Sequence, residues 1–380
     1  MKFPIDTFKD LRTPFYCYDL SLLRRTLKVI NDETEGWPFV VHYALKANAN
    51  LMILREILKA GMGADLVSGN EMLTALDAGF DPQKMAYAGV GKTDWEIETG
   101  LDNDIYCFNV ESVQEMEVIS EIAARKGKTA GIAIRVNPDI DAHTHRYITT
   151  GTATDKFGID ITMLDEVVER AVRLPHLRLL GLHFHLGSQI TTLDPFIMLC
   201  ERANELIDHF KKVGITFEMI DVGGGLGVDY ENPEENSIAP FRDFFNVFKQ
   251  NLKLSNNQKV HFELGRSIVA QCGALISRVV FVKENTLKKF VILDAGMTDL
   301  IRPALYGAHH KIVNLTSQES LIETYDVVGP ICESSDVFSC NEKLPLTSRG
   351  DFIAMLTAGA YGESMASRYN MRDLPHSHFI

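Results

Sequence analysis

Lys46 is a lone cation at the end of an apolar, strand-like stretch, "FVVHYALKA" at residues 39–47. A lysine in an apolar pocket loses solvation of its charged form, so its pKa falls and its neutral amine becomes available. Such an amine acts as a nucleophile or forms a Schiff base with a carbonyl compound. The alternative is a buried structural ion pair, for which Asp65 offers the carboxylate.

Three consecutive glycines, Gly223, Gly224 and Gly225, follow a strand-like segment in "IDVGGGLG". Glycine lets backbone N–H groups converge on an anion, and phosphate is the usual guest. The run has no lysine of the P-loop kind and does not match the dinucleotide pattern G-x-G-x-x-G. It therefore indicates either a phosphate cradle or a tight turn.

Two histidines, His183 and His185, alternate in "GLHFHLGS" and so share one face of a strand. The H-x-H spacing is also one that metal ligands use, with His261 as a possible further ligand. A metal-dependent hydrolase is thus an alternative at this point.

"HFELGR" places Glu263 and Arg266 near the end of another strand-like segment. A carboxylate there could bond a protonated ring nitrogen, and the arginine could bind a carboxylate or a phosphate. The alternative is a salt bridge between the two. The amine would bind an aldehyde, the glycine run a phosphate, and the glutamate a basic nitrogen. Pyridoxal phosphate carries all three groups.

Further along the chain, two shorter motifs carry polar side chains. "RPALYG" separates Arg302 and Tyr306 by four positions, and "PICESSD" sets Cys332 beside Glu333. A lone cysteine after an apolar strand is usually part of the core.

About eight strand-like segments alternate with helical ones between residues 39 and 264, which is typical of a (β/α)8 barrel of the TIM type. A doubly wound open sheet would suit the first units equally well. One helix is clearly bounded, with Asp194 as N-cap, Pro195 in the first turn and Gly214 after its end. In a barrel the chemistry lies where strands end, which is where Lys46 and Glu263 fall.

The pattern changes from about residue 268, where strand-like segments follow one another with few helical stretches. We therefore predict a barrel domain over residues 22–267 and a mostly β domain over 268–380. The opening strand, within residues 1–21, is expected to join the second domain.

Composition limits the partners of the chain. The 380 residues carry a net charge of −13, which argues against nucleic acid or an anionic membrane as a partner. The start lacks the pattern of a signal peptide, and no apolar run could span a bilayer. Six scattered cysteines without metal-ligand spacing predict reduced thiols in a cytoplasmic protein with no bound metal.

Many segments occur in an order that resembles the fold-type III pyridoxal-phosphate decarboxylases, and within them the diaminopimelate decarboxylase family. They are "YALKAN", "ADLVSGNE", "YAGVGKTDWEI", "FNVES", "RVNPDIDAHTHRYITTG", "KFGI", "GLHFHLGSQI", "DVGGGLGVDY", "ELGRS", "LIRPALYGAHH", "VGPICESSD" and "GAYGESMASRYN". The resemblance covers nearly the whole chain. It implies an alanine racemase-like fold with a barrel and a C-terminal β domain, pyridoxal 5'-phosphate as cofactor, and a homodimer with shared active sites.

The resemblance also implies roles for individual residues. Lys46 would form the aldimine, His185 would stack on the ring, Glu263 would pair with the ring nitrogen, and Cys332 of the partner subunit would protonate the quinonoid intermediate. The implied cofactor-binding residues are Lys46, Asp65, His185, Ser188, Gly223, Gly224, Gly225, Glu263, Gly265, Arg266 and Tyr361. The implied substrate-binding residues are Arg266, Arg302, Tyr306, Tyr361 and, from the partner subunit, Glu333.

The implied reaction is the decarboxylation of meso-2,6-diaminopimelate to L-lysine and CO2, the last step of lysine biosynthesis. Two arginines suit a substrate whose far end carries a carboxylate, which ornithine and lysine lack when they are decarboxylated. The alternatives within the fold are a polyamine-pathway decarboxylase acting on a compound such as carboxynorspermidine, a racemase with a tyrosine in place of Cys332, and a cofactor-carrying barrel without a second domain. Two departures are Leu264, where the family often has proline, and a C-terminal end with no further strand-like segment.

Overall fold

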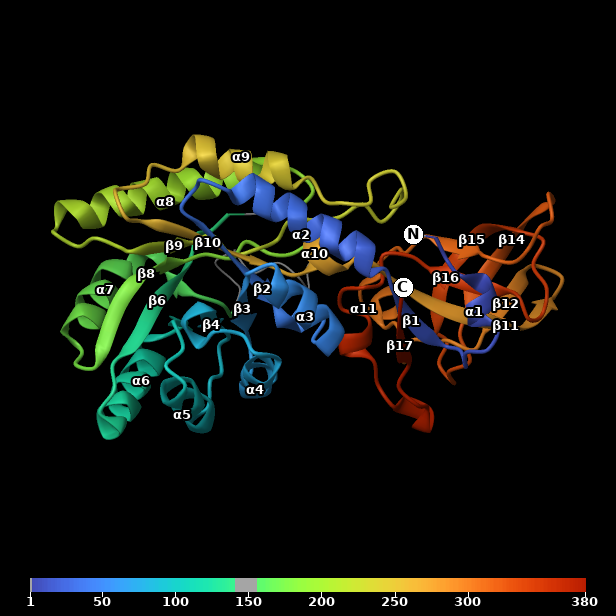
Figure 1. Ribbon diagram of the computed structural model, residues 1–380, viewed down its shortest axis with the longest axis horizontal. Helices are drawn as coiled ribbons and strands as arrows, with labels where there is room; N and C mark the ends of the chain where they lie inside the picture. Colours follow the sequence, from blue (N-terminus) through green and yellow to red (C-terminus); the bar gives the residue numbers. More distant parts are fainter. Residues whose placement is uncertain (1, 141–155) are drawn as a thin grey trace. The chain divides into compact units, whose positions relative to one another are not determined.

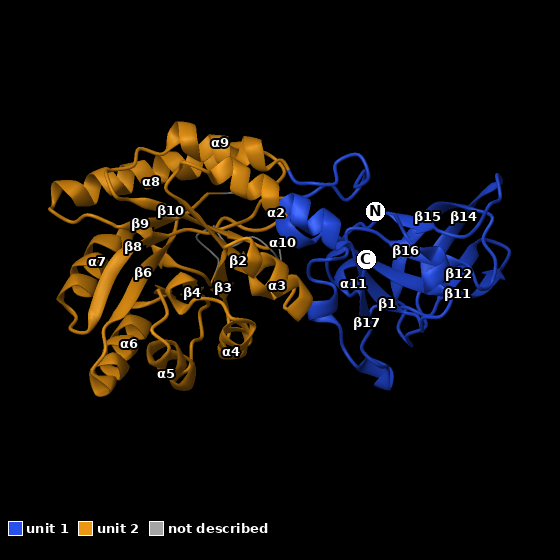
Figure 2. Cartoon of the chain, viewed as in Figure 1, with its two compact units in different colours: residues 1–26, 228–239, 266–380 blue, residues 27–227, 240–265 orange. Residues whose placement is uncertain are grey.

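The computed structural model describes residues 2–140 and 156–380, which form two units (Figures 1 and 2). Unit 1 comprises residues 1–26, 228–239 and 266–380, and unit 2 comprises residues 27–227 and 240–265. Most of the family-like segment "RVNPDIDAHTHRYITTG" lies outside the described residues.

Unit 2 is built on a nine-stranded parallel sheet in the order β5-β4-β3-β2-β10-β9-β8-β6-β7, in which β5 also pairs with β6. That pairing closes a ring of eight strands and leaves only β7 outside it. The predicted (β/α)8 barrel is therefore confirmed, and the open sheet is excluded. The strands are β2 (Phe39–Ala44), β3 (Gly63–Leu66), β4 (Met85–Tyr87), β5 (Cys107–Val110), β6 (Ala130–Asn137), β7 (Ile159–Asp160), β8 (Leu177–His183), β9 (Met219–Asp221) and β10 (Lys259–Leu264).

Helices lie outside the ring of strands (Figure 1). Several begin at side-chain caps, as where Ser68 and Ser112 accept bonds from the backbone of Glu71 and Glu115. The helices are α3 (Leu51–Lys59), α4 (Gly69–Ala78), α5 (Asp94–Asp102), α6 (Val113–Lys126), α7 (Leu164–Arg173), α8 (Asp194–Lys212) and α9 (Phe241–Asn251), with short 3-10 turns η1 (Leu45–Ala47), η2 (Pro82–Lys84) and η3 (Ile161–Met163).

The predicted helix at residue 194 is present as α8, with one correction at its start. Asp194 is its first helical residue, and Leu193 takes the N-cap position without a side-chain cap bond. Pro195 lies in the first turn as predicted, because its missing N–H is not needed there.

Inside the ring, one apolar cluster joins side chains from five different strands. It consists of Ala86, Cys107, Ala133, Leu180 and Met219. All five are buried, so this part of the barrel is filled rather than open.

Unit 1 contains an eight-stranded sheet in the order β13-β16-β11-β12-β14-β15, with β1 pairing with β11 and β17. The strands are β1 (Phe15–Tyr18), β11 (Gly273–Glu284), β12 (Lys289–Leu293), β13 (Ile312–Asn314), β14 (Ile322–Val328), β15 (Val337–Pro345), β16 (Phe352–Met355) and β17 (His376–Phe379). Its helices and turns are α1 (Ile5–Phe8), α10 (Arg266–Val269), α11 (Arg302–Tyr306), η4 (Glu363–Met365) and η5 (Tyr369–Met371), and α2 (Leu20–Thr34) runs on into unit 2. The second, mostly β part of the chain is thus confirmed, and the opening strand belongs to its sheet.

The expectation that no strand follows "YNMRDLP" is wrong. β17 pairs in parallel with β1, and Ile380 exchanges backbone hydrogen bonds with Tyr18 and Leu20. "HSHF" lacks the apolar alternation of a half-buried strand, so only its backbone pairing reveals it.

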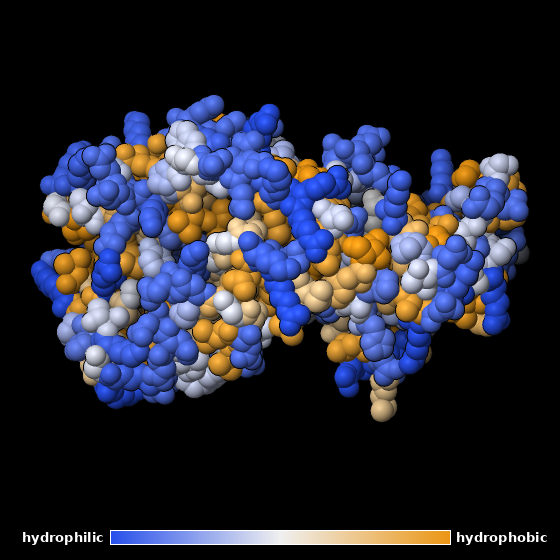
Figure 3. Space-filling view, in the orientation of Figure 1, coloured by the Kyte–Doolittle hydropathy of each residue, from blue (hydrophilic) through white to orange (hydrophobic). Residues whose placement is uncertain are grey.

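Among the described residues, no helix is both long and apolar enough to cross a membrane. Hydrophilic residues cover much of the face drawn in Figure 3, with apolar residues between them. All six cysteines are free thiols, as predicted.

Candidate active site

Lys46 lies in the 3-10 turn Leu45–Ala47, directly after β2. Its Nζ is 3.1 Å from Oδ2 of Asp65, which is fully buried, whereas the lysine side chain is 33% exposed. Burial raises the pKa of Asp65 to about 7, helped by the charge of Glu263 and opposed by Lys46. The ion pair proposed as the structural alternative is present, and part of the lysine side chain remains exposed.

Glu263 is buried at the end of β10 and is held by two donors. Asn109 Nδ2 donates to Oε1 at 3.0 Å, and His183 Nε2 lies 3.2 Å from Oε2. Burial by itself would raise the pKa of Glu263, but His183 and then Lys46 bring it below the ordinary value. Glu263 is therefore an ionised carboxylate in a protein interior, which only bonded partners can stabilise.

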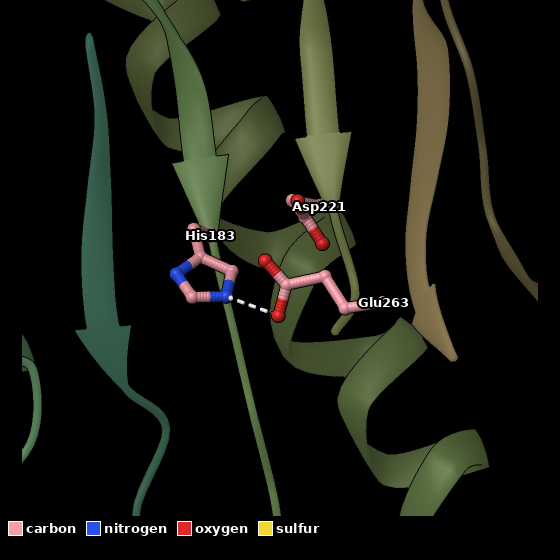
Figure 4. A group of neighbouring side chains, drawn as sticks. All are labelled: His183, Asp221 and Glu263. Carbon is pink, nitrogen blue, oxygen red and sulfur yellow. Dashed lines mark hydrogen bonds and ion pairs between the residues drawn. The ribbon is translucent and has the colours of Figure 1, made fainter. Parts of the chain in front are cut away.

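Asp221 completes a buried group with His183 and Glu263 at the ends of β8, β9 and β10 (Figure 4). One ligand-type atom from each lies within 4.8 Å of the others. Burial, and then the charge of Glu263, raise the pKa of Asp221 well above its usual range, and its Oδ1 accepts a bond from Gly223 N at 2.8 Å. Asp221 thus lies beside the bonded His183–Glu263 pair and is tied to the glycine run through Gly223.

Of the H-x-H pair only His183 belongs to that group, and Nδ1 of His185 lies 3.9 Å from Oε2 of Glu263. His185 lies beyond the end of β8, and His261 instead bonds His42, with Nδ1 of His261 2.9 Å from Nε2 of His42. Burial lowers the pKa of both His42 and His261. The metal site that His261 would complete is therefore not assembled by the described residues.

His185 is a neutral imidazole beside the glycine run. Its Nδ1 accepts a hydrogen bond from Gly224 N at 3.2 Å. Burial lowers the pKa of His185 well below its usual value, and the charges of Lys46 and Arg135 act in the same direction.

The glycine run is required by close approach between strand ends. A Cβ on Gly223 would lie 2.3 Å from Phe184 O, and one on Gly224 would lie 2.0 Å from Glu263 O. Gly223 has φ +68° and Gly225 has φ +104°, which favour glycine. The tight-turn alternative is thus correct as far as the backbone is concerned.

Ser188 and Gly265 lie on either side of that run. Ser188 is half-buried in the segment after β8, which is tied to the run where Ile190 N donates to Gly225 O at 2.8 Å. A Cβ on Gly265 would lie 2.9 Å from the Cβ of Ala47, so the end of β10 packs closely on the turn that carries Lys46.

Unit 1 gathers both predicted arginines around one tyrosine. Arg266 Nη1 donates to Tyr230 Oη at 2.7 Å, and its guanidinium carbon lies 4.9 Å from the ring centre of Tyr361. Arg302 lies 4.9 Å from the ring centre of Tyr230, and its Nη1 is 2.8 Å from Nε2 of His310. Arg266 thus bonds a tyrosine hydroxyl, whereas the structural alternative had predicted a salt bridge with Glu263.

Tyr306, Cys332 and Glu333 are the other predicted residues of unit 1. Tyr306 ends α11, half-buried. Cys332 and Glu333 are both exposed, so the structural alternative for Cys332, packing in the core, is wrong. Cys332 N donates to Asn370 Oδ1 at 3.1 Å, and Tyr369 Oη donates to Glu333 Oε1 at 2.7 Å.

Four residues of these groups were not singled out as site residues by their sequence pattern, namely Asn109, Asp221, Tyr230 and His310. A polar residue inside a short apolar strand, as in "CFNV" and "EMID", was the available signal for the first two. Tyr230 and His310 lie in loops, where polar residues carry no such signal.

Comparison with known proteins assigns the chain to a family. Residues 20–270 match the family described as "Pyridoxal-dependent decarboxylase, pyridoxal binding domain". The chain is 55% identical to the diaminopimelate decarboxylase of Bacteroides thetaiotaomicron over 98% of this chain and 97% of that protein. It is 41% identical to the corresponding enzyme of Aquifex aeolicus, over 95% and 84% of the two chains.

A solved structure agrees with these relatives. The diaminopimelate decarboxylase of Helicobacter pylori, crystallised with L-lysine, superposes with a TM-score of 0.94 at 41% identity, covering 99% of this chain and 93% of that one. The chain therefore belongs to the pyridoxal-dependent decarboxylases and, within them, to the diaminopimelate decarboxylase family.

Proposed function

We propose that this protein converts meso-2,6-diaminopimelate to L-lysine and CO2 with pyridoxal 5'-phosphate as its cofactor, which would be the last step of lysine biosynthesis in the cytoplasm. Its relatives carry the name of that enzyme, and the Helicobacter pylori protein was crystallised with L-lysine. The observation that carries the choice of substrate is the pair of buried arginines, Arg266 and Arg302, held by neutral partners.

The residues of unit 2 fit the cofactor. The partly exposed side chain of Lys46 suits a covalent link to its aldehyde, and the glycine run with Ser188 suits its phosphate. When bound, pyridoxal phosphate supplies an electron sink for the carbon that loses CO2. Asp65 holds the Lys46 side chain in place.

Glu263 keeps a proton on the cofactor's ring nitrogen. An ionised carboxylate that already accepts from Asn109 and His183 still has lone pairs for a third donor. His185, being neutral, would face a cationic ring without repelling it. Gly265 permits the close packing that sets Glu263 beside the Lys46 turn.

Two arginines are proposed to bind the far end of the substrate. Arg266 and Arg302 bind the carboxylate that is not lost, because a guanidinium pairs with a carboxylate through two parallel hydrogen bonds. Tyr306 and Tyr361 contribute hydroxyl groups to substrate and cofactor. The substrate is positioned by the carboxylate that survives in L-lysine.

A homodimer completes the site. Cys332 of the partner subunit delivers the proton that replaces CO2, and the partner's Glu333 holds the distal amino group. The exposure of both residues supports this assignment, because a residue that serves another subunit must face outward from its own. Tyr369 holds the Glu333 carboxylate in one orientation.

Product analysis with three substrates tests the proposal. Purified protein supplied with pyridoxal phosphate is given meso-diaminopimelate, L-lysine or L-ornithine, and the amine products are identified. We expect L-lysine from meso-diaminopimelate, with turnover of the other two at least about a hundredfold slower, since they leave the arginines without a partner. Comparable release of cadaverine or putrescine would contradict the proposed substrate.

A further inference from the structure

Tyr230 and His310 are the side chains that hold the two arginines of unit 1, and neither has a role in the function proposed above. We propose that they are positioning residues that orient Arg266 and Arg302 for the substrate's distal carboxylate and thereby set the preference for substrates that carry one. This inference rests on the proposed function.

Tyr230 contacts both arginines and the histidine. Its hydroxyl accepts the 2.7 Å bond from Arg266, the face of its ring lies 4.9 Å from the Arg302 guanidinium carbon, and its ring meets His310 edge to face at 5.2 Å. A cation over an aromatic face is attracted by the ring, so one side chain holds two cations near each other.

The loop that carries Tyr230 is itself fixed. Asp229 Oδ1 accepts bonds from the backbone N–H groups of Glu231 and Asn232 at 2.8 Å, and its Oδ2 accepts from Asn236 Nδ2 at 2.8 Å. Tyr230 is thus presented on a turn closed by its neighbour rather than on a loose segment.

His310 is locked in one tautomer. Its Nδ1 lies 2.9 Å from Leu356 O, to which it can only donate, so its Nε2 carries a lone pair and accepts from Arg302 Nη1 at 2.8 Å. Burial, and next the charge of Arg302, lower the pKa of His310 to about 3. The imidazole therefore stays neutral and keeps accepting throughout the working pH range.

Because Tyr230 and His310 are neutral acceptors, they leave the charges of the two guanidinium groups available for a substrate carboxylate. A carboxylate partner would occupy the fork of an arginine and cancel its charge, whereas a hydroxyl or an imidazole nitrogen holds one N–H and leaves the rest. Within the described ranges, Arg302 forms no ion pair. Burial lowers the pKa of Arg302, and the nearby charge of Arg266 adds to this, so an arriving carboxylate relieves an unfavourable arrangement.

The test compares two product-like diamines. L-Lysine carries the distal carboxylate and cadaverine is the same chain without it, so the ratio of their dissociation constants isolates that group. Both are measured on the cofactor-loaded protein, by the change in cofactor absorbance, for the unmodified chain and for Tyr230→Phe. This binding measurement needs no turnover.

We expect Tyr230→Phe to weaken L-lysine binding about tenfold and to leave cadaverine binding within about twofold, since a lost hydrogen bond to a charged group has this effect. In turnover of meso-diaminopimelate, KM should rise by about the same factor while kcat stays within about twofold. Tyr325→Phe is the matched control, because it removes another buried tyrosine hydroxyl of unit 1, one that accepts from Thr347 N.

His310 gives an independent check. His310→Leu removes the acceptor and should weaken L-lysine binding about tenfold, whereas His310→Gln restores an acceptor near the Nε2 position and should recover part of the loss. Equal losses for L-lysine and cadaverine in Tyr230→Phe, or no loss for L-lysine, would overturn the positioning role. An unmodified protein that binds L-lysine and cadaverine alike would instead overturn the assignment of the arginines, which belongs to the proposed function.

Discussion

At the scale of residues, three buried carboxyl groups near one end of the barrel have different protonation states. Glu263 stays ionised because His183, and then Lys46, lower its pKa against the effect of burial, whereas burial raises the pKa of Asp65 and of Asp221. Carboxyl groups whose surroundings separate their pKa values take different chemical roles. Glu263 is the one suited to stabilise a positive charge on a bound ring.

Glu263→Gln tests that role. Glutamine has almost the same shape and can still accept from Asn109 or His183, so the fold should persist, but it carries no charge to keep a ring nitrogen protonated. We expect kcat to fall at least about a hundredfold with the cofactor's visible absorbance still present. Glu56→Gln, at a buried carboxylate paired with Lys59, serves as control. Unchanged kcat in Glu263→Gln would show that its charge is not used.

The site residues that could be predicted from the sequence are those whose charge is unexpected where it stands. Residues of common types in common places could not be predicted. Lys46 and Glu263 were identified because a charge at the end of an apolar strand is unexpected. Asn109 was missed because its partner is 154 positions away in the chain, and only the closed ring brings β5 and β10 to the same interior. Tyr230 and His310 were missed because they lie in loops, where a polar residue is ordinary and no pattern marks it.

At the scale of elements, the glycine run lets three strand ends approach each other. Gly224→Ala would set a Cβ 2.0 Å from Glu263 O, which is backbone and cannot rotate away. We expect this variant to lower the free energy of unfolding by about 1–3 kcal/mol, as overpacking does. Gly91→Ala is the matched control, because a Cβ at that residue would meet no other atom within 4 Å. Urea unfolding of both variants measures the difference, and equal stabilities would contradict the account of the run.

The pairing of β2 with β10 buries two neutral histidines, which makes stability depend on pH. His261 has a lowered pKa in the folded chain, so the unfolded chain binds its proton first, below about pH 6.5. Stability is then lost as pH falls below that value, by about 1.4 kcal/mol per pH unit for this group.

His261→Asn keeps a donor towards His42 but cannot titrate. The unmodified chain should therefore lose about 1.4 kcal/mol more of its free energy of unfolding than this variant between pH 8 and pH 5.5. Urea unfolding of both proteins at both pH values measures this difference. A gap that does not change with pH would mean that His261 is not held neutral.

Most elements of the barrel could be predicted, because strands and helices there alternate in regular units with clear caps. The C-terminal strand β17 could not, since a short polar edge strand is held by backbone bonds to β1 that no pattern records. The N-cap of α8 was misplaced by one residue, within the usual uncertainty of helix ends.

At the scale of the whole molecule, the chain was predicted to have a barrel and a mostly β domain, and the boundaries at 22–267 and 268–380 stay a prediction. Residues 228–239 group with unit 1 although they follow a barrel strand. Ion pairs of this segment, such as Glu234 with Lys311 at 2.9 Å, join it to distant parts of the chain that no local pattern connects.

The proposed homodimer with shared active sites predicts complementation between two inactive variants. Lys46→Ala lacks the anchor and Cys332→Ala lacks the proton donor, so each should be inactive alone. When the two chains are unfolded and refolded together, half of the dimers are mixed, and each mixed dimer has one intact site out of two. We expect about a quarter of the activity of the unmodified protein to return. A mixture as inactive as its parents would show that Cys332 serves its own subunit.

The measurement that tests the central claim most directly is the stoichiometry of CO2 and L-lysine formed from meso-diaminopimelate by the unmodified protein and by Lys46→Ala. The account predicts one CO2 and one L-lysine for each molecule consumed by the unmodified protein, and at least about a thousandfold slower turnover by Lys46→Ala. Consumption without L-lysine, or equal turnover by Lys46→Ala, would contradict it.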